Sequence, residues 1–200
     1  MARNRSLVIF GFAMVVALAI IAFSSFGHFS TGFEVHLGNH SLGQIGGHPR
    51  YTSLPAKSAI TIAGKQITVD YYAPEIHGRK IFGGLVPFGV VWCTGANWAT
   101  KITSDADLEM GGLKLPKGSY SIWTIPNPNE WTLIINSQTG QYHLDYDSGA
   151  DFGRTKMNLK TLAASVEKFK IDLTSDGGNK GTLALDWETT EASVPFTVSP

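Results

Sequence analysis

The sequence predicts an all-β domain over residues 58–200, folded as an antiparallel sandwich or a barrel-like sandwich. Short runs of alternating apolar and polar residues are typical of half-buried strands, and the chain has about nine or ten of them. Turn residues, mainly glycine, proline and asparagine, separate these runs at close spacing. Strands and helices do not alternate as they do in parallel sheets, which favours antiparallel pairing.

The first two predicted strands form a hairpin. Apolar residues alternate over 59–63 and again over 67–71, and the two-residue turn Gly64-Lys65 separates the two runs. Each of the next expected strands is bounded by a turn, and together they cover residues 99–104, 108–110, 113–115, 119–125 and 130–136.

The last third of the domain is expected to hold a second hairpin. Alternation over residues 168–173 and 183–187 flanks a turn at 176–179, so each strand has one buried face and one solvated face. The remaining segments of this third have different patterns, and they predict a helix and one more strand.

Residues 161–167 are expected to form a short helix, because apolar residues at 162, 166 and 169 have helical spacing. A final strand is expected at residues 193–198. Pro195 lies within it and indicates an edge position, because proline has no backbone N–H to donate to a neighbouring strand.

The composition is that of one globular domain with additional segments. The chain has 200 residues, of which 43% are hydrophobic and 16% are charged, and its net charge is zero. Because no basic excess is present to neutralise phosphates, we expect no binding to nucleic acid. Cys93 is the single cysteine, which excludes an internal disulfide and a CxxC zinc or redox motif.

Residues 1–26 are expected to be a membrane anchor or a signal segment. Arg3 and Arg5 precede an apolar run over residues 7–23, and a helix of that length spans most of a ~30 Å hydrocarbon core. The arginines place the amino terminus inside and the domain outside the cytoplasm. Small residues near Ser25 also fit signal cleavage, but the run exceeds a usual signal core, which favours a retained anchor. The domain is therefore expected in the periplasm or at the cell surface, and it is secreted if the leader is cleaved.

Residues 27–57 are expected to be a flexible linker, because glycine, histidine and short polar residues replace the alternating pattern. This segment holds four of the six histidines, at positions 28, 36, 40 and 48. A metal-binding tract is the alternative interpretation, but the spacings fit no compact ligand set. The sequence implies no metal site and no cofactor.

The domain is organised around residues 72–100, which we call the central loop. This connection is long and lacks regular periodicity, and such loops are usually functional or disordered. Its many large apolar residues argue against disorder, because their burial is favourable. We therefore expect an ordered, packed loop, and we expect any site to lie beside it.

The central loop also carries a family resemblance. Residues 78–89 (GRKIFGGLVPFG) and 92–97 (WCTGAN) resemble the signature of a bacterial family, domain of unknown function 2911, and the likeness extends over residues 58–198. That family has no assigned activity and its members look like exported proteins, so the resemblance implies no catalytic residues. Where the family usually reads Arg-Pro and Trp-Arg-Thr-Gly, this chain has Ala73-Pro74 and Trp92-Cys93-Thr94-Gly95. A site that depended on those arginines is lost here.

Two polar features of the central loop are candidates for chemistry. Cys93 is a candidate nucleophile with His77 or His143 as its base, but cysteine is more often a small buried apolar residue, and we favour that interpretation. The cluster His77-Gly78-Arg79-Lys80 has the charge to hold an anion. We favour a structural role for Arg79, in which it binds backbone carbonyls or an acid such as Glu75.

Three further patterns have plain structural alternatives. Asp145, Asp147 and Asp151 resemble the start of a calcium loop but lack its acidic twelfth position, so a polar loop is favoured. Residues 177–182 resemble a phosphate loop but are expected to be a hairpin turn. The third pattern is a group of aromatic residues that form either a ligand platform or, as we favour, mostly core: Trp92, Trp98, Tyr120, Trp123 and Trp131.

These observations predict a membrane-tethered, non-catalytic envelope module that binds or scaffolds a small-molecule or protein ligand. The alternative is an extracytoplasmic hydrolase with a pocket near Cys93, Asn97 and His77. The sequence assigns no ligand class and no oligomeric state. The residues expected to meet a ligand are His77, Arg79, Thr94, Asn97 and Trp98.

Overall fold

The computed structural model describes residues 52–199, and this part of the chain is built from strands and one short 3-10 turn, η1 (Ser148–Ala150). Residues 52–199 contain no α-helix, and therefore no helix in this part of the chain is long and apolar enough to cross a membrane. The expected anchor at residues 1–26 lies outside the described residues. The strands are β1 (Leu54–Ile62), β2 (Lys65–Ala73), β3 (Thr100–Ser104), β4 (Leu108–Met110), β5 (Leu113–Leu115), β6 (Gly118–Ile125), β7 (Trp131–Asn136), β8 (Asp151–Gly177) and β9 (Lys180–Val198).

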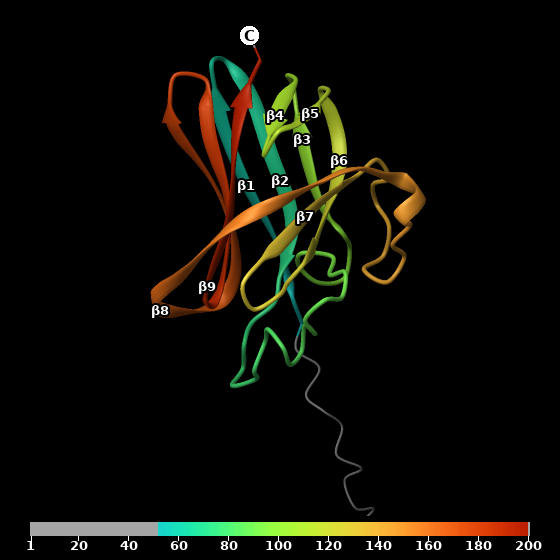
Figure 1. Cartoon of the computed structure of the whole chain (residues 1–200), viewed down its shortest axis with the longest axis vertical. Helices are drawn as coiled ribbons and strands as arrows, with labels where there is room; N and C mark the ends of the chain where they lie inside the picture. Colours follow the sequence, from blue (N-terminus) through green and yellow to red (C-terminus); the bar gives the residue numbers. More distant parts are fainter. Residues whose placement is uncertain (1–51, 200) are drawn as a thin grey trace, which may run out of the picture. The chain divides into compact units, whose positions relative to one another are not determined.

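All strand pairs in the sheet are antiparallel, which confirms the predicted all-β, antiparallel class (Figure 1). The nine strands form one sheet in the order β1-β2-β3-β6-β7-β8-β9-β4-β5. β1 and β5 are its two edges, so the sheet does not close into a barrel. β1 begins at Leu54, and residues 54–57 of the expected linker therefore belong to the sheet.

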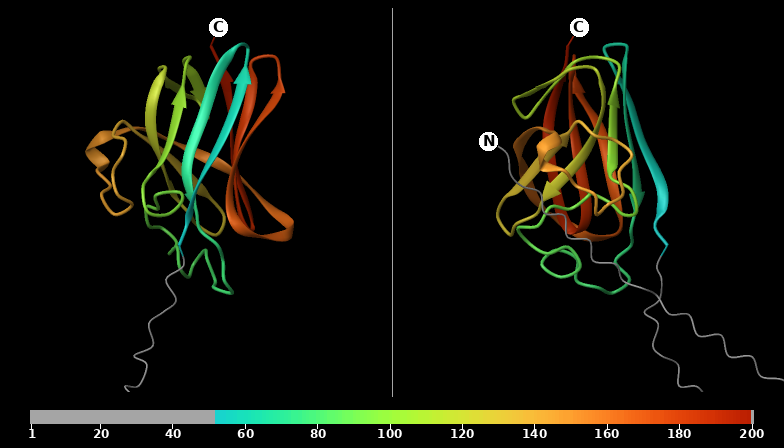
Figure 2. Two further views of the ribbon diagram at one scale, coloured as in Figure 1. Left: turned by 180° about the vertical axis from the view of Figure 1, so that it is seen from behind. Right: turned by 90° about the vertical axis from the view of Figure 1, so that its right-hand side faces the viewer.

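The two longest strands, β8 and β9, are strongly bent (Figures 1 and 2). The Val198 N–H donates to the Asn179 carbonyl at 2.8 Å, so the two ends of β9 lie together and the strand must fold back. The bend is at Glu188, whose φ of 51° is a left-handed conformation. β8 bends opposite this point, where its register with β9 shifts between Thr161 and Lys170.

Two predictions for β8 and β9 are wrong. The expected helix at 161–167 is wrong, because residues in this segment belong to β8 and pair with β9, and strand pairing overrides the local apolar spacing. The expected edge position of Pro195 is wrong because β9 lies between β8 and β4. Pro195 follows the last pair with β8, at Ser193, and precedes the first pair with β4, at Phe196, where the missing N–H disrupts neither ladder.

The β1–β2 hairpin is confirmed, but its turn is one residue earlier than expected. Ile62 pairs with Lys65, so the two turn residues are Ala63 and Gly64, with φ of 50° and 74°. Two consecutive positive φ values are those of a type I′ turn, whose twist matches that of the flanking strands. The hairpin packs against the second half of β8, where the Ile171 N–H donates to the Tyr71 hydroxyl at 3.2 Å.

The hydrophobic core continues from the strands into the central loop. Ile81, Phe82 and Val86 are buried, which confirms that the loop is ordered and packed. Phe82 lies edge-on to Trp131 with ring centroids 4.7 Å apart, and Trp92 stacks on Trp187 at 5.8 Å. Aromatic pairs of this kind contribute beyond the area that they bury. The loop is therefore held by the same core that holds β7, β8 and β9.

Candidate functional site

Glu188, at the bend of β9, holds the backbone of the central loop. Its Oε1 accepts a hydrogen bond from the Ile81 N–H at 2.8 Å, and its Oε2 accepts one from the Phe82 N–H at 3.3 Å. The Val86 N–H in turn donates to the Ile81 carbonyl at 2.9 Å, which closes a tight turn. One carboxylate from a strand more than a hundred positions away thus fixes the middle of the loop.

Arg79 and His77 hold the first part of the central loop. Arg79 donates from Nε to the Ile76 carbonyl at 2.9 Å and from its terminal nitrogen to the Glu75 carbonyl at 2.5 Å. The His77 N–H donates to Oε1 of Glu167 at 2.8 Å, and its Nε2 lies 3.2 Å from Oε2 of Glu75. Arg79 thus makes the backbone-carbonyl contacts that its favoured structural role predicts.

A cleft of about 310 Å³ lies between the central loop and its neighbours. Its lining includes the buried Trp187 and the partly buried Trp92, which we call its floor, and the exposed side chain of Leu85. Two predicted ligand-binding residues, Arg79 and Asn97, line it. Its other lining residues are Ser53, Pro74, Glu75, Val86, Cys93, Gly95, Ala96 and His143.

Asn97 stands at the rim of this cleft. Its φ of 61° is tolerated better by asparagine than by most residues, and it turns the chain sharply before β3. The side-chain amide donates to the Ser53 carbonyl at 3.4 Å, and the Asn97 carbonyl accepts from the His143 N–H at 3.0 Å. Asn97 therefore ties the start of the described chain and the 137–147 segment to the central loop.

Thr94, Trp98 and His77 do not line the cleft. Thr94 is fully buried, and its hydroxyl contacts the Trp92 carbonyl at 3.4 Å and the Thr124 hydroxyl at 3.2 Å. Its polar atoms therefore serve the fold. Trp98 is on the surface outside the cleft. The expected set of five ligand-binding residues is thus divided between the cleft, the core and the surface.

Cys93 lies in the floor of the cleft with 2% of its surface exposed. Burial raises the pKa of its thiol from 9.0 to about 12, although hydrogen bonding to the Gly95 backbone opposes the shift. The thiol is therefore protonated at neutral pH, whereas a nucleophilic cysteine needs a lowered pKa. His143 lines the same cleft and His77 does not. Cys93 fits the favoured interpretation of a small buried residue.

The aromatic residues are mostly core. Trp92, Trp123 and Trp131 pack in the interior, and Tyr120 contacts Phe152 with ring centroids 5.6 Å apart. Trp98 is the exception, because 48% of its surface is exposed.

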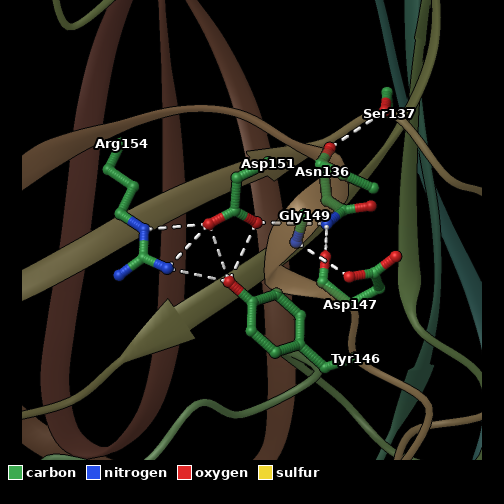
Figure 3. Close-up of polar contacts among 8 residues, drawn as sticks. Asn136, Ser137, Tyr146, Asp147, Gly149, Asp151 and Arg154 are labelled. Atoms are coloured by element: carbon green, nitrogen blue, oxygen red, sulfur yellow. Dashed lines mark hydrogen bonds and ion pairs between the residues drawn. The ribbon is translucent and has the colours of Figure 1, made fainter.

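Two of the three aspartates near η1, Asp147 and Asp151, bind neighbouring residues of the fold (Figure 3). The Asp151 carboxylate accepts from the Arg154 guanidinium at 2.7 Å, from the Tyr146 hydroxyl at 2.8 Å and from the Asn136 amide at 3.1 Å. The Asp147 side chain accepts from the Gly149 N–H at 2.8 Å, as an N-cap. Among residues 52–199 no three His, Cys, Asp or Glu side chains are grouped to hold a metal ion. These contacts support a polar loop in place of a calcium site, and residues 178–179 form the predicted hairpin turn.

Comparison with known protein families shows which family the chain belongs to. A family model described as a protein of unknown function (DUF2911) matches residues 53–196. The chain belongs to the DUF2911 family. Neither a curated protein nor a solved structure matches it. In this DUF2911 domain Ala73 and Cys93, the two positions at which we expected a departure from the family pattern, are both buried, and Cys93 and Pro74 line the cleft.

Three residues that form or hold the cleft were not predicted to do so. Glu188 and Glu167 bind loop backbone from β9 and β8, and Trp187 closes the floor. Trp187 fits the alternation of a buried strand, which predicts burial but not a partner. The two glutamates follow no motif, because each acts through backbone N–H groups that any residue supplies.

Proposed function

We propose that this protein is an extracytoplasmic, membrane-tethered β-sandwich module that binds a small ligand in the cleft beside the central loop. The observation that carries the proposal is the cleft itself, whose floor is apolar and whose rim has a few polar groups. Binding sites for small molecules usually combine these features. The apolar run at residues 7–23, preceded by two arginines, supports export and tethering.

The contacts around the cleft favour a ligand with no net charge. Arg79 and Glu75 line the cleft with opposite charges, and no other arginine, lysine, aspartate or glutamate of the described residues lines it. Cys93 keeps its proton, so the floor is neutral. A partly apolar ligand would contact Trp92 and Trp187 and accept or donate a hydrogen bond at the Asn97 amide.

A thermal-shift screen of the full chain against neutral small molecules, sugars, cell-wall fragments, small anions and metal ions tests this function. A ligand at a hundred times its dissociation constant adds about 2.7 kcal/mol of stability, which raises the melting temperature by about 5–10 °C for a domain of this size. The shift should shrink in Asn97→Gly, which removes the amide but allows the positive φ. Ala96→Phe fills the cleft and should abolish the shift.

Leu144→Ala is the matched control, because this leucine is 74% exposed and does not line the cleft. Its ligand shift should equal that of the parent protein. A ligand that stabilises Ala96→Phe as much as the parent does not bind in the cleft, and that result would sink the proposal. Arg79→Ala is a poorer test because it also releases the backbone carbonyls that Arg79 binds.

The alternative function is a hydrolase that uses this cleft, and the observation that favours it is that His143 and Cys93 both line the cleft. A protonated, buried thiol needs the histidine within hydrogen-bond reach to become a nucleophile. A panel of ester and amide substrates with the parent, Cys93→Ala and His143→Ala separates the two functions. Turnover lost in both variants would support the hydrolase, and turnover by none of the three proteins would leave binding.

A further inference from the structure

A second concavity lies on the outer face of the β1–β2–β3 portion of the sheet. It has a volume of about 510 Å³, which is within the range of about 300–1,000 Å³ for ligand pockets. It shares no lining residue with the cleft beside the central loop. The residues that line this groove are Pro55, Ala56, Lys57, Asp70, Tyr71, Tyr72, Trp98, Ala99, Lys101 and Gly140.

Trp98 gives the groove an exposed aromatic wall. Its ring is held edge-on by Tyr142, with centroids 5.8 Å apart and an interplanar angle of 84°. Trp98 and Tyr142 also form an isolated backbone bridge, and the Ala99 N–H donates to the Gln141 carbonyl at 3.1 Å. An indole that is half-exposed yet held on its edge and at its backbone is suited to bind a ligand with little loss of entropy.

Three charged side chains cross the groove in a row, because their residues are paired across three strands. Lys57 pairs with Asp70, and Asp70 pairs with Lys101. The ammonium of Lys57 lies 3.4 Å from Oδ1 of Asp70, and that of Lys101 lies 3.5 Å from Oδ2. All three side chains are about half exposed, so donors and acceptors remain accessible. The row has a net charge of +1.

We propose that this groove binds a saccharide that carries a carboxylate. The C–H face of a pyranose ring would lie on the Trp98 indole, while Asp70 accepts from ring hydroxyls and the two lysines donate to hydroxyls and to the carboxylate. Asp70 is the residue that separates this ligand from a simple anion. A phosphate or an acidic peptide offers few hydroxyl donors to a carboxylate at the centre of the row, whereas the ring hydroxyls of a saccharide can donate to it.

The experiment is a ¹H–¹⁵N correlation spectrum of the full chain in detergent, titrated with trigalacturonic acid. The chain has five tryptophans, and Trp98→Phe assigns the indole signal of Trp98. That signal should move, while the signals of Trp92 and Trp187, which report on the cleft, should not. The proposal for the groove and the proposal for the cleft are therefore tested independently.

Two comparison ligands test whether the groove needs both the sugar rings and the carboxylate. The methyl ester of the trisaccharide has the same rings without the charge, and it should bind several-fold more weakly. Triglutamate has the charge without the rings and should not move the Trp98 signal. Equal binding of acid and ester would overturn the role of the lysines. Binding of triglutamate in place of the saccharide, or no binding of either saccharide, would overturn the proposal.

Two variants with matched controls locate the contact. Trp98→Ala should weaken binding at least about tenfold, as expected for an aromatic anchor. Lys101→Met should weaken binding of the acid more than that of the ester, because only the acid also loses its partner for the carboxylate, and the affinity of the acid should fall with salt. Phe152→Ala and Lys114→Met replace an exposed ring and an exposed lysine outside the groove and should have no effect. Equal losses in variants and controls would also overturn the proposal.

Discussion

Replacement of Glu188 by alanine should release the central loop from β9. The substitution removes one hydrogen bond of 2.8 Å and one of 3.3 Å, and it leaves the N–H groups of Ile81 and Phe82 without their acceptor. A hydrogen bond to a charged group contributes about 1.5–3 kcal/mol, and the longer bond falls at or below the low end. We expect Glu188→Ala to lower the free energy of unfolding by about 3 kcal/mol. The positive φ adds nothing to this difference, because both side chains have a Cβ.

Urea unfolding and amide hydrogen exchange measure this effect. Glu188→Gln keeps one acceptor oxygen and should lose about 1–2 kcal/mol, since the charge is removed and one bond stays. Glu191→Ala is the control, because Glu191 is also on β9 but forms a surface ion pair, 3.6 Å from Lys160, which contributes about 0–1 kcal/mol. In Glu188→Ala the amides of Ile81 and Phe82 should exchange faster. Equal costs for Glu188→Ala and Glu191→Ala, with unchanged exchange at both amides, would refute the anchoring role.

Three further results are expected. Asn136→Ala removes three hydrogen bonds within and beside the network of Figure 3 and should cost about 3 kcal/mol, which thermal unfolding would show as a fall of about 6–12 °C; a fall below 2 °C contradicts the account. Cys93 should resist a thiol reagent at pH 8 until the protein unfolds, because burial raises its pKa to about 12. Fast labelling of the native protein would contradict this prediction. Stability should decline as the pH rises above 9, because folded Cys93 and Tyr146 keep protons to about pH 12 that the unfolded chain releases near 9 and 10; Cys93→Ala should reduce the slope, and an unchanged slope would contradict it.

The strands were predictable because alternation and turn residues are local. The segments at 99–104 and 119–125 match β3 and β6 within a residue, and each has a clear change of pattern at its ends. The bends of β8 and β9 were not predictable in the same way. Residues 183–187 and 193–198 have the patterns of two strands, and the chain between them also belongs to β9, so only the pairing partners show one bent strand. The apolar spacing near residues 161–167 predicted a helix wrongly for the same reason, because pairing with β9 is not visible in the local pattern.

The location of the cleft was predictable from the central loop, but its composition was only partly so. Arg79 and Asn97 line it as expected, because polar residues within a packed loop tend to face its concave side. Thr94 was expected to meet a ligand, yet it binds Thr124 in the interior, since a threonine beside a buried strand satisfies its hydroxyl there. Glu188 and Trp187 come from a distant strand, and contacts at that separation leave no pattern within one sequence.

The most direct test of the central claim, that the central loop forms a ligand cleft, is an indole ¹H–¹⁵N spectrum of the full chain with the strongest compound from the thermal-shift screen. The account predicts that the signals of Trp92 and Trp187 move with the concentration of the compound and that Ala96→Phe abolishes both shifts. A compound that stabilises the protein while both signals stay unchanged would contradict the claim. A screen in which nothing stabilises the chain would contradict it as well, and the central loop would then serve the fold alone.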